Sequence, residues 1–228
     1  VPLGAELGRR LAAPVSIDSD VNLAALAEHW FGQARGLNDF LVVNVERSLG
    51  LGILHNGELF RGANGLSPDL GDFMLRAPSD GGGRLADVAT ETAVLADAEA
   101  EPLARPEQAM AALLTRADDG DADAVAALAK AGEALGFAIA NLITLFAPPK
   151  VIVSGRAMAA SPHFIAPLRA SVAALLPPSL ADVSEIVVRE WSERIWVQGA
   201  AAMILRELYG APWGTTGPAP RRETGGTA

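Results

Sequence analysis

The amino-acid sequence predicts an α/β fold in which helices flank a mixed β-sheet. Short apolar runs of strand length alternate with longer segments of helical periodicity. One pair of apolar runs is joined by Asn56-Gly57, which is typical of a two-residue hairpin because both turn positions favour positive φ. Half of the 228 residues are hydrophobic and only 5% are aromatic, as in an ordinary helix-rich globular protein. Strands alternating with helices, together with one hairpin, indicate both parallel and antiparallel neighbours in the sheet.

The first half of the chain contains most of the expected strands. A short buried strand leads into the turn Asp18-Ser19-Asp20, and a helix with Leu23, Leu26 and Trp30 on one face follows it. A loop rich in Gly, Asn, Ser and Pro comes after the hairpin. The predicted strands cover residues 13–17, 40–45, 51–55, 58–60 and 73–76, the helix covers residues 21–31, and the loop covers residues 62–71.

The second half of the chain is mainly helical. Its predicted helices cover residues 85–98, 106–115, 122–146, 162–176 and 195–209, and its strands cover residues 151–154 and 185–189. The tail over residues 214–228 consists largely of Gly, Pro and Thr with little apolar content. We therefore expect the tail to be disordered.

Net charge and cysteine content exclude several classes of protein. The formal net charge is −9 and the isoelectric point is near 4.8, so the chain by itself is a poor nucleic-acid binder. Cysteine is absent, which excludes disulfides and thiolate metal sites and fits a reducing cytoplasm. The three histidines, His29, His55 and His163, lie far apart in the sequence, so a zinc site is not expected.

Neither a membrane span nor a secretion signal is predicted. The apolar run over residues 135–146 is too short to cross a bilayer, and Asn141 and Thr144 interrupt it. The first residues lack the basic and then apolar pattern of a signal peptide, and the chain does not start with Met. We expect a cytoplasmic protein whose sequence begins inside a longer chain.

Several motifs follow one another in a characteristic order. They are the Asp-containing turn at residues 18–20, the glycine-containing strand pair, Asn-Gly-Glu-Leu-Phe-Arg-Gly-Ala-Asn-Gly at 56–65, Pro-Lys-Val-Ile-Val-Ser-Gly at 149–155 and Val-Gln-Gly-Ala-Ala-Ala at 197–202. Over residues 14–209 the chain resembles the ROK family, which groups sugar kinases with sugar-responsive transcriptional repressors. The resemblance implies an actin-like ATPase fold of the sugar kinase and Hsp70 type, with ligands in a cleft between two lobes. This chain would form mainly the second lobe.

The same resemblance implies a division of the chain. Residues 1–36 would end the first lobe, and residues 37–193 would form the second lobe, which binds the effector and oligomerises. Residues 194–213 would be a terminal helix that returns to the first lobe, followed by the disordered tail over residues 214–228. The family's first phosphate loop and any helix-turn-helix would precede Val1.

Asp20 corresponds to the catalytic base of the family's kinases. Phosphoryl transfer to a sugar hydroxyl needs a carboxylate that orients the nucleophile and takes its proton. A simpler alternative is that Asp18, Ser19 or Asp20 caps the following helix. Ser19 replaces the family's Asn and keeps a hydrogen-bonding group with a shorter reach. We predict Ser19 and Asp20 as ligand contacts, with a catalytic role for Asp20 only if the chain is a kinase.

Asp69 and Asp72 stand at the Glu and His positions of the family's Gly-Glu-x-Gly-His motif. In that motif the Glu holds sugar hydroxyls and the His also helps to bind zinc. We predict Asp69, Asp72 and the loop Ala63-Asn64-Gly65 as ligand contacts. Two nearby carboxylates repel, so one would be protonated or paired with Arg61 or Arg76. The alternative is that both Asp side chains are solvated loop residues.

The family's zinc loop would fall at about residues 77–86. Its cysteines are absent, Arg84 stands at a Cys position, and Ala86 replaces a sugar-binding Glu. The resemblance therefore predicts that the metal has been lost, and we expect no cofactor.

Residues 45–50, Val-Glu-Arg-Ser-Leu-Gly, replace a Gly-Thr-Gly-like loop that lets backbone N–H groups approach phosphate closely. Glu46 would place a negative charge beside a polyphosphate, at a cost on the order of several kcal/mol in a partly desolvated cleft. Arg47 adds bulk, although a contact from it to phosphate would offset part of the repulsion. Glu46, Arg47, Ser48 and Gly50 thus form a degenerate phosphate loop. The alternative is that Glu46 and Arg47 form a structural ion pair.

These departures indicate a transcriptional regulator that has lost its kinase chemistry. Gly155-Arg156-Ala157 also replaces the triple glycine that lies against adenosine in the family. We predict a sugar or sugar derivative as effector, DNA contact only through a module outside this chain, and a homodimer or homotetramer. Two alternatives stay open: an active ATP-dependent sugar kinase with an unusual loop, and a dimerisation scaffold that no longer binds a ligand.

Overall fold

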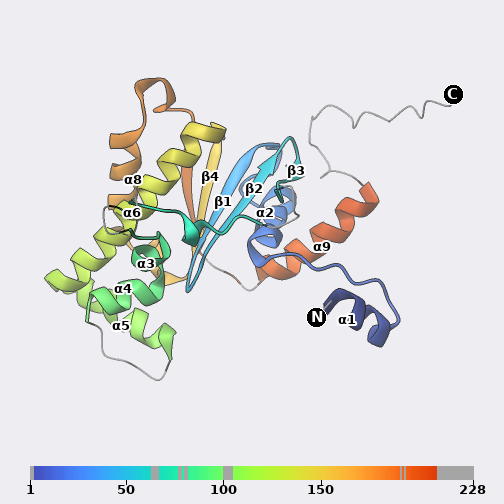
Figure 1. Ribbon diagram of the computed structural model, residues 1–228, viewed down its shortest axis with the longest axis horizontal. Coiled ribbons are helices and arrows are strands. Elements are labelled where there is room, and N and C mark those ends of the chain that lie inside the picture. Colours follow the sequence, from blue (N-terminus) through green and yellow to red (C-terminus); the bar gives the residue numbers. More distant parts are fainter. Residues whose placement is uncertain are drawn as a thin grey trace.

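A mixed β-sheet lies at the centre of the molecule (Figure 1). The computed structural model describes residues 3–62, 67–76, 79, 82–99, 105–190, 192 and 194–209. The strand order in the sheet is β3-β2-β1-β4-β5. The strands are β1 (Phe40–Val45), β2 (Leu49–His55), β3 (Glu58–Leu59), β4 (Lys150–Gly155) and β5 (Glu185–Glu190). β1, β2 and β3 pair antiparallel, whereas β1, β4 and β5 pair parallel.

β1 is the central strand, and all six of its residues are buried. Its register places Val42 opposite Gly52 of β2 and Ile152 of β4. A strand covered on both faces has no solvent side, which explains why Phe-Leu-Val-Val-Asn-Val is a continuous apolar run rather than an alternating one.

Helices cover both faces of the sheet (Figure 1). α6 (Ala122–Phe146) and α8 (Pro162–Leu175) cover one face, and α2 (Asp20–Phe31) and α9 (Arg194–Tyr209) cover the other. Successive residues of β1 pack alternately into the hydrophobic cores on the two faces of the sheet. Leu41 and Val43 pack with α6, whereas Phe40 and Val42 pack with α2. This alternation follows from the two-residue period of a strand.

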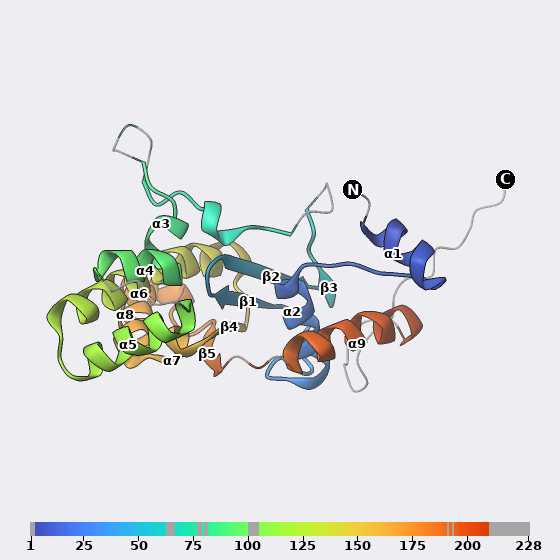
Figure 2. The same cartoon turned by 90° about the horizontal axis from the view of Figure 1, so that it is seen from below.

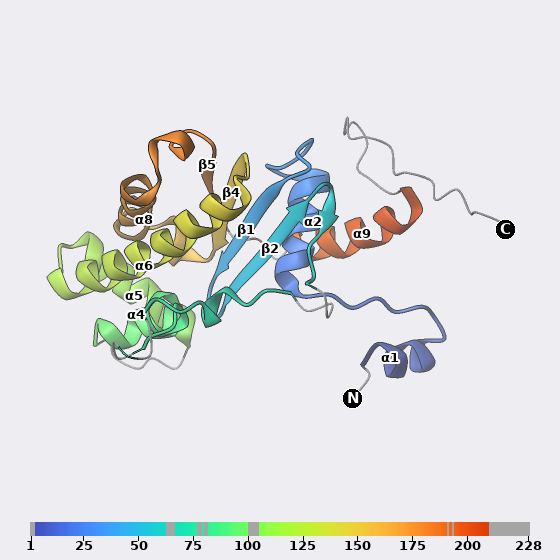
Figure 3. The ribbon, with the colours of Figure 1, turned by 45° about the horizontal axis from the view of Figure 1, so that its top comes forward.

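The remaining helices extend this three-layer body. They are α1 (Leu3–Leu11), α3 (Ala86–Ala89), α4 (Glu91–Asp97), α5 (Pro106–Asp118) and α7 (Ala157–Ala160), with short 3-10 helices η1 (Leu70–Asp72) and η3 (Pro178–Leu180). Figure 2 shows α4 and α5 beside α6, on the side of the molecule away from α9. α1 stands apart from the sheet and has no buried residue (Figure 3).

α6 is long and apolar enough to cross a membrane by length and composition. In the folded chain 61% of its most apolar stretch is buried. Leu128, Leu135 and Ile139 are among its residues with no exposed surface, and they pack into the core beneath the sheet. Such burial is typical of the core helix of a globular protein.

The sequence predicted most elements within one to three residues. The hairpin is confirmed, with φ of 53° at Asn56 and 77° at Gly57. The single helix predicted over residues 85–98 is in fact two, because Thr90 is extended at φ −80° and ψ 155° and caps α4 through its side chain. α1 and α7 were not predicted.

Two predicted strands are wrong. Residues 13–17 have no strand partner among the described residues, and Ile17 is 55% exposed. Residues 73–76 form only an isolated bridge between Met74 and Arg84. Both segments have the local composition of a strand, but a strand also needs a neighbour that supplies its hydrogen bonds. The division into lobes stays a prediction; α2 and α9 pack on the same sheet that residues 37–193 form. Residues 214–228 lie outside the described residues.

Candidate functional site

The start of α2 lies against the first half of β2, directly after the turn that joins β1 to β2. Gly50 and Gly52 on β2 make this close approach possible. A Cβ atom on Gly50 would come within 3.0 Å of the Val21 side chain, and one on Gly52 within 2.9 Å of the Val21 carbonyl oxygen. The motif residues at 18–22 and the degenerate phosphate loop at 45–50 are therefore neighbours in space.

Ser19, not Asp20, caps α2. The Ser19 hydroxyl accepts a hydrogen bond from the Asn22 backbone N–H at 3.3 Å. Asp20 is the first residue of α2 and is exposed, and its Oδ1 accepts a hydrogen bond from the Val21 N–H at 2.7 Å. Because the capping role belongs to Ser19, the Asp20 carboxylate keeps free lone pairs for a ligand.

Asp18 organises the backbone and side chains behind Asp20. It accepts hydrogen bonds from the Ser19 N–H at 2.9 Å, from Asn22 Nδ2 at 2.6 Å and from the guanidinium of Arg61. Burial alone would raise the pKa of Asp18, but the hydrogen bonds from Arg61, Asn22 and Ser19 outweigh burial and lower it. Asp18 is therefore a buried, ionised and fully engaged carboxylate.

Asn22 and Ser67 extend this network back to Ser19. The fully buried Asn22 donates from Nδ2 to the Ser67 hydroxyl at 2.7 Å, and the Ser67 and Ser19 hydroxyls lie 3.0 Å apart. Sequence reasoning missed the roles of Asn22 and Ser67. Asn22 follows Ser19 by three residues, the spacing of a helix cap, so the sequence contained a signal for the position of Asn22. The role of Ser67 could be found only from the fold. The predicted contacts Ala63, Asn64 and Gly65 lie outside the described residues.

Glu46 pairs with Arg156 rather than with its neighbour Arg47. The Glu46 carboxylate is 3.8 Å from Arg156 Nε, and its side chain is only 17% exposed. Burial raises the pKa of Glu46, and the charge of Arg156 offsets part of that rise. The predicted alternative of an ion pair between Glu46 and Arg47 is therefore wrong, because the fold brings the end of β4 to the turn. Arg47 and Ser48 are exposed at the tip of that turn.

Two further glutamates surround the Arg156 guanidinium. Glu107, at the start of α5, accepts a hydrogen bond from Arg156 Nη1 at 2.9 Å. Glu91, at the start of α4, is only 7% exposed, and its backbone N–H donates to the Glu46 carbonyl at 2.9 Å. Burial raises the pKa of Glu91, and the neighbouring Glu46 carboxylate raises it further. We call Glu46, Glu91, Glu107 and Arg156 the acidic cluster.

The acidic cluster occupies the place that the sequence predicts for a phosphate loop. Glu46 comes from the β1–β2 turn, Glu91 and Glu107 from two helix N-termini, and Arg156 from the segment that follows β4. Three carboxylates and one guanidinium leave an excess of negative charge, which repels a polyphosphate. Sequence reasoning identified Glu46 and Arg156 but not Glu91 and Glu107, which no local pattern distinguishes from surface glutamates.

Asp69 and Asp72 have different environments. Asp69 caps η1 by accepting a hydrogen bond from the Gly71 N–H at 2.9 Å, and its backbone bridges to Gly50. Asp72 is 65% exposed at its side chain and forms an ion pair with Arg84. The predicted pairing of an Asp with Arg61 or Arg76 is wrong, since Arg61 binds Asp18 and Arg84 supplies the partner of Asp72.

An ion pair joins two positions at which relatives would carry zinc ligands. Asp72 stands at the His position and Arg84 at a Cys position of the resemblance described above. Arg has no lone pair to offer a metal, so this donor set does not fit zinc. Among the described residues no three His, Asp or Glu side chains form a metal-binding group.

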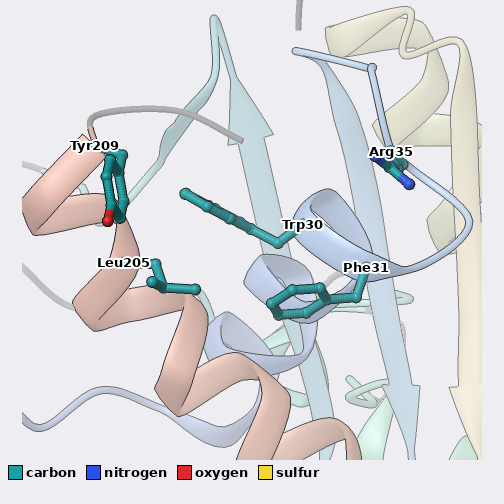
Figure 4. Close-up of a pocket in the computed structure, with 5 residues that line it drawn as sticks. All are labelled: Trp30, Phe31, Arg35, Leu205 and Tyr209. Atoms are coloured by element: carbon teal, nitrogen blue, oxygen red, sulfur yellow. The ribbon is translucent and has the colours of Figure 1, made fainter. Parts of the chain in front are cut away.

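Two pockets lie beside α9, and the predicted contact residues line neither of them. One, of about 270 Å³, is lined by Trp30 and Phe31 of α2, by Arg35, and by Leu205 and Tyr209 of α9 (Figure 4). The other, of about 340 Å³, lies between α2, α9 and β3. The predicted contacts are instead connected by local contacts: the Ser19 and Ser67 hydroxyls lie 3.0 Å apart, and the backbone of Asp69 bridges to Gly50.

The sheet and its covering helices define the class of protein. Solved structures with the same arrangement include a ROK hexokinase from Thermus thermophilus, with a TM-score of 0.74 and 25% identity over 88% of this chain and 70% of that one. They also include a ROK family transcriptional regulator, a homologue of the Escherichia coli MLC protein, with a TM-score of 0.73 and 24% identity over 88% of this chain and 54% of that one. The fold is therefore the actin-like ATPase fold of sugar kinases and related regulators.

The chain belongs to the ROK family, whose model matches residues 1–207. Relatives include a glucokinase from Halalkalibacterium halodurans, 28% identical over 90% of this chain and 68% of its own length. They also include a xylose repressor from Caldicellulosiruptor bescii, 26% identical over 93% of this chain and 57% of its own length. Both kinases and repressors are thus among its relatives, and the chain spans little more than half of the repressor.

Proposed function

We propose that this chain is the effector-binding and oligomerisation portion of a ROK-type transcriptional regulator that has lost kinase chemistry. The acidic cluster is the observation that carries the proposal. An ATP-binding site needs room and positive or neutral groups at the phosphates. In this chain the side chains of Glu46 and Arg156 would fill the space that the phosphates need. Glu107 and Glu91 bring the number of carboxylates in the cluster to three.

The effector is a sugar or sugar derivative that contacts Asp20 and Asp69. Each carboxylate accepts one backbone hydrogen bond, which leaves further lone pairs to accept hydrogen bonds from sugar hydroxyls. Ser19, Ser67 and the loop at 63–65 would complete the contact surface. Ligand binding would favour one arrangement of the lobes in a homodimer or homotetramer, and so reposition a DNA-binding module outside this chain.

A sugar kinase is the second candidate. The observation in its favour is the exposed Asp20 carboxylate, which is not used to cap α2 and could take a proton from a sugar hydroxyl. A kinase would need ATP to bind despite the acidic cluster. Nucleotide affinity therefore separates the two candidates.

The test is calorimetric titration of the complete protein with ATP and Mg²⁺, together with a thermal-shift screen against a panel of neutral sugars. The regulator hypothesis expects stabilisation by at least one sugar and no heat from nucleotide. A coupled assay that detects sugar-dependent ADP release would overturn it in favour of the kinase. Stabilisation by no sugar would instead favour a scaffold that only dimerises.

A further inference from the structure

A charged pocket lies between α2, α9 and β3, outside the site described above. Its volume is about 340 Å³, at the lower end of the range for small-molecule sites. The lining residues are Leu26, Glu58, Arg61, Met203, Arg206 and Glu207. Figure 1 shows α9 running beside α2, next to the hairpin that ends in β3. We call it the two-arginine pocket.

Arg206 brings a positive charge into this pocket at a cost in desolvation. Its side chain is 19% exposed, and its ion-pair partner Glu58 is 68% exposed on the short edge strand β3. Burial lowers the pKa of Arg206, and Asp18 acts on it in the opposite direction. A solvated carboxylate compensates a buried guanidinium poorly, because water screens the attraction.

Arg61 shares its buried counter-charge with Arg206. Asp18 is 8% exposed at its side chain and bonds Arg61 through Nε, at 3.2 Å, and through Nη2. The same carboxylate is the charge that supports Arg206 electrostatically. Two guanidinium groups therefore share one buried carboxylate, Asp18, whereas the other two carboxylates at the pocket, Glu58 and Glu207, are exposed and screened by water.

We propose that the two-arginine pocket binds the oxyanion group, a phosphate or a carboxylate, of a small molecule between Arg61 and Arg206. The ligand's oxyanion takes the place of the Glu58 carboxylate, which moves into solvent. Guanidinium groups match the geometry of oxyanions with paired N–H donors. Leu26 and Met203 supply an apolar wall for the carbon part of the ligand.

Arg61 connects the pocket to the sugar site. Its partner Asp18 accepts a hydrogen bond from Asn22 Nδ2 at 2.6 Å, and the same nitrogen donates to the Ser67 hydroxyl at 2.7 Å. The Ser67 hydroxyl in turn lies 3.0 Å from the Ser19 hydroxyl. An anion that recruits Arg61 weakens its hold on Asp18 and so changes sugar affinity at the start of α2. This linkage rests on the proposed function, whereas anion binding itself does not. Thermodynamic reciprocity requires the sugar to change anion affinity by the same factor.

The test is titration calorimetry with sodium phosphate and sodium glucuronate, with glucose as the uncharged match and ionic strength held constant with sodium chloride. Arg206→Gln is expected to weaken anion binding roughly 10- to 100-fold, the loss typical of a charge-assisted hydrogen bond. Glu58→Gln is expected to strengthen it several-fold, because it removes the competing carboxylate. Arg35→Gln, which removes an exposed charge from the other pocket, is the matched control and should bind anions like the parent chain.

Heat from phosphate alone identifies a phosphate ligand, and heat from glucuronate alone identifies a carboxylate ligand. If neither phosphate nor glucuronate gives binding heat, the proposal is wrong. An equal loss of anion affinity in Arg206→Gln and Arg35→Gln also contradicts it. If Arg206→Gln fails to fold, the substitution at the exposed position 58 still tests the proposal. Anion affinity that is unchanged in Glu58→Gln contradicts anion binding in the two-arginine pocket. Sugar affinity that is unaffected by a bound anion refutes the linkage alone, and the absence of any sugar binding refutes the proposed function alone.

Discussion

Glu46 and Arg156 show how the fold brings opposite charges together at the turn between β1 and β2. By resemblance, both stand where relatives carry small residues that approach nucleotide. In the fold they lie 3.8 Å apart, with Glu107 bonded to the same guanidinium and Glu91 buried beside them. The Arg156 charge also acts on Glu91, but burial and the neighbouring Glu46 carboxylate outweigh it and leave the pKa of Glu91 raised.

At the same scale, Asp20 can be tested as a ligand contact. Asp20→Asn should weaken sugar binding about tenfold or more, because the amide replaces an anionic acceptor of charge-assisted hydrogen bonds. Calorimetry with the sugar that stabilises the parent chain measures the change. Asp123→Asn, in the first turn of α6, is the control for loss of a helix-start carboxylate. Equal sugar affinity in Asp20→Asn and the parent chain would remove Asp20 from the site.

Glu91 leads to a prediction about pH. Because burial and Glu46 raise the pKa of Glu91 in the folded chain, the folded state binds more protons than the unfolded state at pH values between the two pKa values. Its contribution to stability therefore falls as pH rises from the unfolded pKa, about 4.3, through the raised folded pKa. At neutral pH, Glu91→Gln should raise the melting temperature by about 2–4 °C, the shift that roughly 1 kcal/mol produces in a domain of this size.

Thermal melts of Glu91→Gln between pH 4 and pH 8 measure this effect. The variant's gain over the parent chain should grow with pH across the window between the two pKa values. Glu133→Gln on the outer part of α6 is a control, because that residue is exposed. A variant that is less stable than the parent chain at neutral pH would mean that the Glu91 charge supports the fold.

At the scale of elements, the contact between α2 and α9 holds one face of the sheet together. A Cβ atom on Gly199 of α9 would lie 2.0 Å from the Leu23 carbonyl oxygen of α2, so the two backbones touch. The same closeness brings Arg206 of α9 near Asp18 and places the two-arginine pocket between the helices. The position of α9 therefore sets the geometry of both the core and the pocket.

Gly199→Ala should destabilise the chain by about 1–3 kcal/mol, because the added methyl group forces the helices apart. Chemical denaturation measures the change in the free energy of unfolding. Gly4→Ala is the matched control: a Cβ atom there would meet its nearest neighbour at 3.5 Å, and Ala is the better helix former. Equal stability of the two variants would show that α9 can shift without loss.

At the scale of the whole molecule, an ion pair joins Asp72 to Arg84 across residues 73–83 of the sequence. Asp72 is the last residue of η1 and Arg84 lies two residues before α3, so their contact links the end of η1 to the start of α3. Both side chains are more than half exposed, and such pairs stabilise proteins by no more than about 1 kcal/mol. Leu70 of η1 and Leu85, next to α3, are buried in the core, and this packing anchors the two elements more strongly than the ion pair does.

Metal removal should therefore leave the whole molecule unaffected. Incubation with EDTA and 1,10-phenanthroline is expected to leave the melting temperature unchanged, because chelators unfold only chains whose fold depends on a metal. Elemental analysis of the purified protein is the companion measurement. A lower melting temperature after chelation that zinc restores would mean that other residues hold a metal.

The local elements could largely be predicted from the chain itself. β1 is a continuous apolar run, the Asn56-Gly57 turn has positive φ at both positions, and α6 follows the helical period over residues 122–146. These features depend on neighbours a few residues apart, so local sequence is enough to specify them. The motif order also identified the family, whose model matches residues 1–207.

The sequence alone determined most of the secondary structure, the family and the residue types available at the site. Only the tertiary structure decided which charges meet: Asp18 with Arg61, Glu46 with Arg156, and Asp72 with Arg84. It also decided that residues 13–17 are not a strand. The physical reason is the same in each case. A hydrogen bond or ion pair needs a partner from another part of the chain, and the packing of helices on the sheet fixes which partner comes within reach.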